Sequence, residues 1–160
     1  MTTDAGSRGP SDLGGLLDAA PDAIVVIDPS GTIVLVNAQT ETVFGYERGE
    51  LLGQPVEMLV PGNLHELHRK HRDEYVDEPH VRTMGSGLDL RARRKDGSEF
   101  PVEISLAPLV TDDGLLISAA VRDVTSKRRE ERLFRGLLEA APDAMVIVDK
   151  GGTIVLVNAQ

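Results

Sequence analysis

The amino-acid sequence predicts an α+β fold in which short helices cover one face of an antiparallel β-sheet. Three observations support this prediction. Two apolar, β-branched runs at residues 23–28 and 32–36 come first, three further strand-like runs follow between residues 88 and 124, and glycines and prolines divide the segment between them into short helices. A strand pair, then helices, then three strands is an order typical of an antiparallel sheet with helices on one side.

A helix precedes the first strand pair. Apolar residues recur at helical spacing from Leu13 to Ala20, and Pro21 ends the helix. The two strands are joined by a turn at residues 28–31 that contains both proline and glycine. We therefore expect a helix followed directly by a β-hairpin.

The middle of the chain predicts several short helices. Asn37 is a favourable N-cap for a helix that runs to about Phe44. Glycines and a proline then separate two further helical turns. The longest helix is expected at residues 64–77, and Pro79 closes it.

The last third of the chain predicts three strands and a final helix. The strands span residues 88–94, 100–109 and 115–124, and a tight turn at residues 95–97 joins the first two. Apolar and charged side chains alternate along the first of these strands, so one face points toward a core. Residues 127–141 are charged and then apolar, which predicts a helix that leaves the domain.

An internal repeat sets the domain organisation. Residues 16–39 recur without gaps at residues 137–160, and both copies contain APDA and GTIVLVNAQ. Such identity indicates one repeating domain of about 120 residues. We expect the front part of a longer protein, with a disordered tail at 1–12, a complete domain at 13–125, a linker helix at 126–141 and the start of a second domain at 142–160.

Composition excludes several classes of function. The 160 residues carry 17 Lys+Arg against 26 Asp+Glu, a formal net charge of −9, whereas nucleic-acid binding needs a basic face. The absence of cysteine excludes disulfides, thiolate metal sites, cysteine nucleophiles and cysteinyl-flavin adducts. No run reaches the roughly 18–20 apolar residues of a membrane span, and the N-terminus does not resemble a signal peptide. We therefore expect a cytoplasmic protein without a nucleic-acid partner.

Taken in order, the motifs resemble the PAS domain family, the S-box sensory domains of bacterial signalling proteins. The matching pieces are APDAIVVID with GTIVLVN, FGYERGELLGQ, RRKDGSEFPVEIS and RDVT. The resemblance implies a five-stranded antiparallel sheet whose short helices enclose a cavity, followed by an exit helix. It also implies a regulatory role and a downstream effector in the same protein, such as a histidine kinase. This chain itself contains no catalytic motif.

The resemblance also indicates how a signal leaves the domain. Asp123 and Thr125 match the family's D-x-T junction between the last strand and the exit helix, through which a shift of the sheet would pull on that helix. Apolar residues on the helix predict a homodimer of paired exit helices, the alternative being one helix that packs on its own domain. The residues of this seam are Leu133, Phe134, Leu137 and Leu138.

A cavity for a small ligand is implied by the same resemblance. Its candidate lining residues are Val26, Val36, Phe44, Leu90, Ile104 and Ile117, each of which ordinary core packing explains equally well. The chain has no Trp, three Phe and two Tyr, so there is little aromatic surface on which a flavin could stack. A flavin is therefore not expected, and the ligand or cofactor is not identified.

Three histidines, His65, His68 and His71, lie three residues apart on the helix expected at 64–77 and therefore share a face. In the oxygen-sensing haem kinases of the family, a histidine on this helix ligates iron, and His68 falls at that position. This makes His68 a candidate haem ligand. Leu88 falls where those proteins carry the distal arginine that contacts bound gas.

Other interpretations of the histidines need no haem. An i, i+3 histidine pair can ligate zinc or nickel, but beyond Glu66 and His80 no further ligands are evident, so no metal site is predicted. The sequence from His65 to Leu67 resembles the H-E-L box of histidine kinases but lacks its proline. The simplest interpretation is a solvated helix face.

The sequence therefore predicts a sensory or regulatory domain that binds a small ligand or cofactor and relays its state through the exit helix to an effector. Two alternatives stay open. One is a ligand-free module for protein–protein interaction or dimerisation. The other is a haem-based gas or redox sensor.

Overall fold

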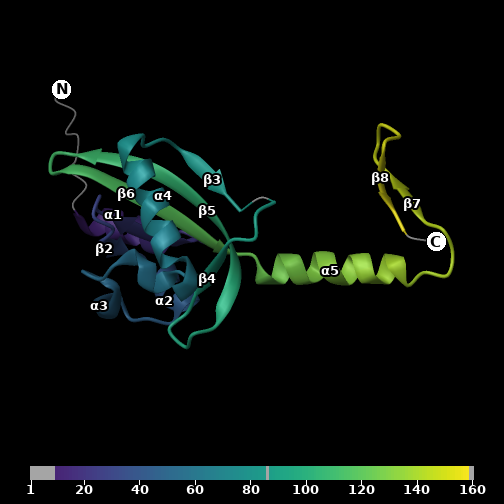
Figure 1. Ribbon diagram of the computed structural model, residues 1–160, viewed down its shortest axis with the longest axis horizontal. Helices are drawn as coiled ribbons and strands as arrows, with labels where there is room; N and C mark the ends of the chain where they lie inside the picture. Colours follow the sequence, from purple (N-terminus) through teal and green to yellow (C-terminus); the bar gives the residue numbers. More distant parts are fainter. Residues whose placement is uncertain (1–9, 86, 159–160) are drawn as a thin grey trace, which may run out of the picture. The chain divides into compact units, whose positions relative to one another are not determined.

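A computed structural model of the chain describes residues 10–85 and 87–158 (Figure 1). The chain divides into two compact units, one that ends at Asp123 and one that begins at Val124. Each is described by itself. Among the helices of the described residues, none combines the length and the hydropathy that crossing a bilayer requires.

The strands of the first unit form one antiparallel sheet. Its order is β2-β1-β6-β5-β3, and β4 also pairs with β5. The longest pairing joins β5 to β6 through a hairpin. The strands are β1 Ala23–Ile27, β2 Ile33–Val36, β3 Arg82–Met84, β4 Arg91–Arg93, β5 Glu99–Thr111 and β6 Gly114–Asp123.

The sheet has six strands where the sequence predicted five. The expected strand at 88–94 is reduced to β4, and the additional β3 lies before it on the same neighbour, β5. Gly85 and Gly87 separate the two, because both have positive φ, a conformation that a continuing strand does not adopt. A Cβ at Gly85 would also lie 2.8 Å from the carbonyl oxygen of Val102 on β5.

Short helices supply the second layer, and Figure 1 shows α4 crossing the sheet. Helix α1 begins at Pro10, three residues before the expected start at Leu13. The predicted cap is confirmed, since Asn37 accepts a hydrogen bond from the backbone of Thr40 and begins α2. The helices are α1 Pro10–Asp18, α2 Ala38–Phe44, α3 Arg48–Leu51, the 3₁₀ turns η1 Val56–Leu59 and η2 Gly62–Leu64, and α4 His65–Asp77.

The core of the first unit lies between the sheet and these helices. Phe44 of α2 and Phe100 of β5 meet edge to face, with ring centroids 5.6 Å apart, and Tyr75 of α4 is buried in the same cluster. Phe44, Ile33 and Leu51 are among the largest fully buried side chains. The apolar side chains of the strands thus pack against apolar side chains of α2, α3, η1 and α4.

A fully buried amide joins the first helix to the sheet. Oδ1 of Asn37 accepts from the backbone N–H of Ile24 at 2.8 Å, and its Nδ2 donates to the carbonyls of Leu17 at 2.9 Å and Asp22 at 3.0 Å. Buried amides of this kind are kept only where their hydrogen bonds are made. Asn37 therefore fixes the end of α1 against the first hairpin.

The second unit repeats this arrangement. It contains α5 Thr125–Glu139 and the hairpin β7 Val146–Val148 with β8 Ile154–Val157. Oδ1 of Asn158 accepts from Met145 at 2.8 Å, and its Nδ2 donates to the carbonyls of Leu138 at 3.0 Å and Asp143 at 2.9 Å. Asn158 thus holds the end of α5 by hydrogen bonds equivalent to those by which Asn37 holds the end of α1.

Candidate functional site

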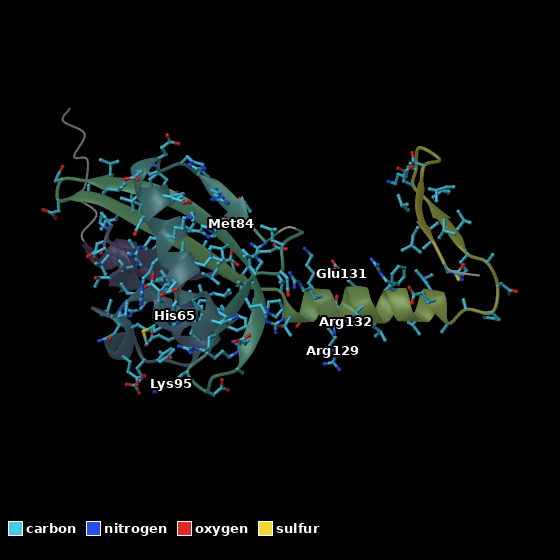
Figure 2. All side chains as sticks on the ribbon, in the orientation of Figure 1. His65, Met84, Lys95, Arg129, Glu131 and Arg132 are labelled. Atoms are coloured by element: carbon cyan, nitrogen blue, oxygen red, sulfur yellow. The ribbon has the colours of Figure 1, made fainter. Side chains whose placement is uncertain are left out.

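Helix α4 turns one row of side chains toward the interior. His68, Arg72 and Tyr75 follow one another at spacings of four and three residues and so share a face of the helix. Tyr75 is buried in the core, the Arg72 side chain is 13% exposed and the His68 side chain is 36% exposed. His65 lies at the start of α4 (Figure 2).

A buried carboxylate binds two of these side chains. Glu57 of η1 is only 3% exposed, and its Oε1 accepts from Nη1 of Arg72 at 2.7 Å and lies 3.1 Å from Nδ1 of His68. A buried carboxylate is costly unless it is paired and hydrogen-bonded, and removing one partner of such a pair typically costs about 3–5 kcal/mol. Glu57, His68 and Arg72 therefore form one unit, which we call the α4 charge cluster.

The turn between β1 and β2 completes the surroundings of this cluster. Gly31 has φ +90°, and a Cβ built there would clash with Nη1 of Arg72 and lie 2.7 Å from its Cζ. The carbonyl of Gly31 accepts from the backbone N–H of Val56 at 2.9 Å, next to Glu57. The guanidinium thus lies where α4, η1 and the β1–β2 turn meet, in space that only glycine leaves open.

One donor of Arg72 has no acceptor. Its Nη2 lies 3.2 Å from Oδ1 of the exposed Asp73, but its Nε is the one buried side-chain N or O atom among the described residues that lacks a hydrogen-bond partner. An unsatisfied buried donor is unfavourable by about 1–3 kcal/mol. Buried donors without a partner are rare in native folds, so the unpaired Nε of Arg72 needs a physical reason.

Most of the candidate lining residues face one apolar interior. Val36, Phe44 and Ile117 belong to the buried cluster, and Leu90 and Ile104 pack against it. Val26 does not. It is buried, but it pairs with Ser118, whereas its neighbours Val25 and Ile27 point into the cluster, so Val26 lies on the opposite face of the sheet.

The histidines do not converge on one point. Nε2 of His65 lies 2.9 Å from the carbonyl of Val60, His71 is exposed, and Nδ1 of His80 lies 2.8 Å from the carbonyl of Glu78. Glu66 is exposed as well. In the part of the chain that the structure describes, no group of three or more His, Cys, Asp or Glu could hold a metal ion.

The surroundings of His68 do not fit a haem, the cofactor that the resemblance implies there. Cofactor sites of this kind are lined predominantly by apolar side chains. Here the residue one turn further along the inner face of α4 is the half-buried Arg72, and the Nδ1 side of the imidazole meets the buried Glu57. A porphyrin on His68 would therefore need an apolar wall where this fold places an ion pair.

Arg91, Arg93, Arg94 and Lys95 form a run of four basic residues at the β4–β5 turn, and several of them pair with groups of their own domain. Nζ of Lys95 lies 2.6 Å from Oε1 of Glu50, and Nε of Arg91 lies 3.6 Å from Oε2 of Glu99. The ion pair between Glu50 and Lys95 lowers the pKa of Glu50 and raises the pKa of Lys95 through their side-chain hydrogen bond. These cations stabilise turns and strands of their own domain.

Arg94, from the same run, connects the core to the last residue of the sheet. Its Nη2 donates to Oδ2 of Asp123 at 2.8 Å, its guanidinium carbon lies 3.8 Å from the centroid of the Phe100 ring, and Nη1 donates to the carbonyl of Val43. Asp123, the first junction residue, is therefore held by an arginine that touches α2 and the core. Thr125, the second, begins α5.

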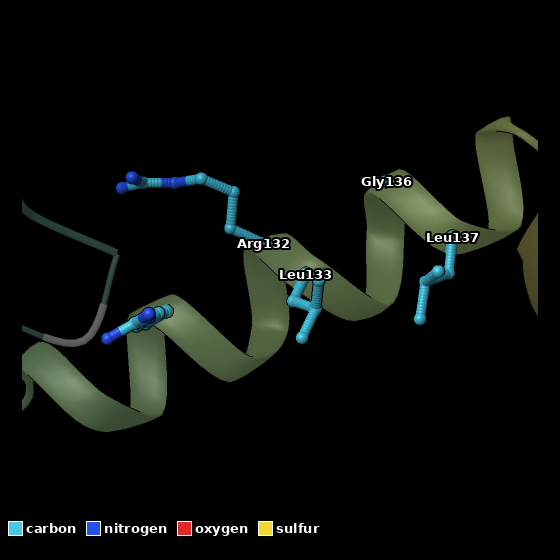
Figure 3. Close-up of a pocket in the computed structure, with 5 residues that line it drawn as sticks. Arg132, Leu133, Gly136 and Leu137 are labelled. Carbon is cyan, nitrogen blue, oxygen red and sulfur yellow. The ribbon is translucent and has the colours of Figure 1, made fainter.

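The apolar seam of α5 is shorter than the sequence predicted. Leu133, Phe134 and Leu137 are exposed, but Leu138 is buried within the second unit, where its carbonyl accepts from Asn158. Leu138 therefore does not continue the exposed seam. A shallow hollow on the helix surface lies along the remaining seam (Figure 3), lined by Arg129, Arg132, Leu133, Gly136 and Leu137.

Sequence reasoning did not find Glu57, Arg72 or Arg94. Charged residues on a short helix are usually solvated, so Glu57 and Arg72 gave no signal of burial. The two are also separated by fifteen residues, and their pairing depends on how η1 and α4 pack. For Arg94, the run of four basic residues ahead of a tight turn was visible, but its partner Asp123 was not.

Proteins of similar sequence and fold show which family the chain belongs to. Residues 21–126 match a PAS domain family, and residues 132–160 match a second one. The chain is 30% identical over 128 residues to the sensor protein FixL of Bradyrhizobium diazoefficiens (76% of this chain and 24% of FixL) and 26% identical over 126 residues to the oxygen sensor protein DosP of Escherichia coli (78% of this chain and 16% of DosP).

Among solved structures, the PAS domain of a Colwellia psychrerythraea protein superposes with a TM-score of 0.59 at 26% identity, covering 72% of this chain and 97% of that domain. The chain spans about a quarter or less of the length of the two curated relatives. Matching motifs, sheet order and superposition all lead to one conclusion. The chain belongs to the PAS domain family and carries a sensory PAS domain over residues 21–126.

Proposed function

We propose that this PAS domain holds a small ligand in the interior beneath α4 and relays its state through Asp123 and α5 to an effector elsewhere in the same protein. Two of its relatives are named as sensor proteins and others as histidine kinases that control cell division, which supports an effector of the kinase type. The observation that carries the proposal is the contact of Arg94 with both Phe100 and Asp123.

These contacts give a physical route for the relay. Phe44 lies on α2 against the interior and meets the edge of Phe100, and the guanidinium of Arg94 lies over the Phe100 ring. A ligand that displaces Phe44 therefore also displaces Phe100 and Arg94. Because Arg94 holds Asp123, the last residue before the exit segment moves with the core. The relay needs no charge transfer, only close packing.

Hydrogen exchange tests the relay without knowledge of the ligand. Phe44→Leu removes part of the ring volume and imitates a change inside the core. We expect it to change amide exchange in the first two turns of α5, and we expect Arg94→Gln to abolish that effect of Phe44→Leu. Lys95→Gln is the matched control, because Lys95 pairs with Glu50 and not with Asp123. Exchange that changes in the first unit alone would contradict the relay.

A second candidate function is dimerisation through α5. The exposed Leu133, Phe134 and Leu137 carry it, since large apolar side chains on one helix face typically mark an interaction surface. We infer that the partner is α5 of a second copy, as the seam alternates with charged residues suited to a helix pair. Sedimentation of the chain with Leu133→Gln and Leu137→Gln should show monomers, and Leu16→Gln, on the exposed face of α1, should leave the dimer intact.

A further inference from the structure

The α4 charge cluster contains more hydrogen-bonding capacity than the protein uses. A guanidinium presents its Nε–H and one Nη2–H along a single edge, and this edge matches the two oxygens of a carboxylate. In Arg72, Nη1 is occupied by the buried Glu57, which leaves the edge formed by Nε and Nη2. Nε has no partner, and Nη2 has only Asp73, whose side chain is 68% exposed.

The two elements that carry Glu57 and Arg72 also contribute side chains to the apolar core. Val56 and Met58, on either side of Glu57, pack against the core, as do Tyr75 and Val76, which follow Arg72 on α4 by one turn. A ligand bound at the guanidinium would therefore lie beside two elements that also carry core side chains. Glu57 holds Nη1 of the arginine in place, and the guanidinium fills the space that a side chain at Gly31 would take.

We propose that Arg72 binds the carboxylate of a small organic acid with a short apolar chain, and that this acid is the ligand of the PAS domain. The carboxylate takes Nε and Nη2 of Arg72, and Asp73 turns to solvent, while Glu57 stays on Nη1. The inference rests on the proposed function in assuming that the interior is the sensory site. It assigns to Arg72, and not to His68, the main contact with the ligand.

Calorimetric titration of the whole chain tests this assignment with two pairs of probes. Butyrate and benzoate are the acids, and butyramide and benzamide are their uncharged counterparts, all at one constant ionic strength. We expect the acids to bind and the amides to bind at least about tenfold more weakly, since a charge-assisted bidentate contact is lost. Equal affinity of acid and amide, or no binding of either acid, would overturn the proposal.

Two variants locate the contact. Arg72→Lys keeps the positive charge beside Glu57 but removes the Nε–Nη2 edge, so acid affinity should fall at least about tenfold. Lys70→Gln, an exposed cation on the same helix, should leave it unchanged. If Arg72→Lys binds the acids as the unchanged chain does, the carboxylate does not bind at Arg72 and the proposal falls.

Asp73→Asn keeps the proposal testable should Arg72→Lys fail to fold. It weakens the one group that competes for Nη2, so acid affinity should rise severalfold, and a fall in affinity would contradict the proposed edge. The hydrogen-exchange test of the relay uses no ligand. The carboxylate assignment can therefore fail while the relay through Arg94 stands, and the two failures are distinguishable.

Discussion

Asn37 and Asn158 hold two equivalent hairpins by the same side-chain hydrogen bonds. Each accepts at Oδ1 from a backbone N–H at 2.8 Å, and each donates from Nδ2 to the last turn of a helix, Leu17 in the first unit and Leu138 in the second. The repeat in the sequence is thus a repeat of a helix–hairpin junction.

Replacing the first of these amides should destabilise the first unit. Asn37 is fully buried, and Asn37→Ala removes the side-chain partner of the Ile24 N–H and of the Asp22 carbonyl and one of two hydrogen bonds to the Leu17 carbonyl. We expect a loss of about 3 kcal/mol in the free energy of unfolding, measured with urea. Asn37→Asp keeps the Oδ1 acceptor but places a carboxylate oxygen against the carbonyls of Leu17 and Asp22, so it should lose at least as much as Asn37→Ala. A loss below about 1 kcal/mol for the alanine variant would contradict this role.

Gly31→Ala should be more damaging than the same change at Gly97. Both glycines have similar positive φ, +90° and +85°, so alanine meets about 1 kcal/mol of backbone strain at either position. At Gly31 the new Cβ also clashes with the guanidinium of Arg72, whereas nothing lies within 4 Å at Gly97. We expect urea unfolding to show a loss at Gly31 at least about 2 kcal/mol larger, because the buried ion pair is displaced. Equal losses would show that Arg72 adjusts freely.

The turn between β1 and β2 should weaken in acid. Burial of Asp28 opposes its charged form, but hydrogen bonds from Ser30, Thr32 and Gly31 outweigh this and lower its pKa below the usual value of 3.8. A carboxyl with a lowered pKa contributes stability above its unfolded pKa, and this is lost as pH falls through the folded value. Unfolding between about pH 5 and about pH 2 should therefore depend less on pH in Asp28→Asn. An unchanged pH dependence would refute this.

The absorption spectrum decides between haem and the charge cluster. We expect the chain, expressed with added haem and purified, to show no Soret band, because Glu57 and Arg72 occupy the inner face of α4 beside His68. A Soret band that is lost in His68→Ala would show that the ion pair gives way to a porphyrin. His71→Ala, on the exposed side of the helix, is the control.

The sequence was informative wherever one local pattern decided the structure. The first hairpin, the Asn37 cap and the long α4 follow from β-branched runs, a single side chain and helical spacing. The face of Val26 could not be predicted, because every residue from Ala23 to Ile27 is apolar and such a run does not show which face is inward.

What the sequence missed depends on contacts between distant segments. The ion pair of Glu57 with Arg72 and that of Arg94 with Asp123 arise only when separate elements pack together. The spacing of four residues between Phe134 and Leu138 places both on one face of the helix, which is why the sequence predicted a shared seam. Leu138 is buried at the end of α5, where Asn158 donates to its carbonyl, and helical spacing alone does not reveal this.

The hydrogen bonds of Asn158 have a consequence for anyone who recombines such domains. Because α5 begins two residues after the last strand of the first unit and ends in the junction that α1 provides there, the strand of one module is connected to the hairpin of the next by a continuous helix. Each residue added to or removed from α5 turns everything beyond it by about 100°, and only about seven residues, two turns, restore the original phase. Grafts that join one sensory domain to another should therefore be designed by helical phase, with whole heptads as the unit of exchange.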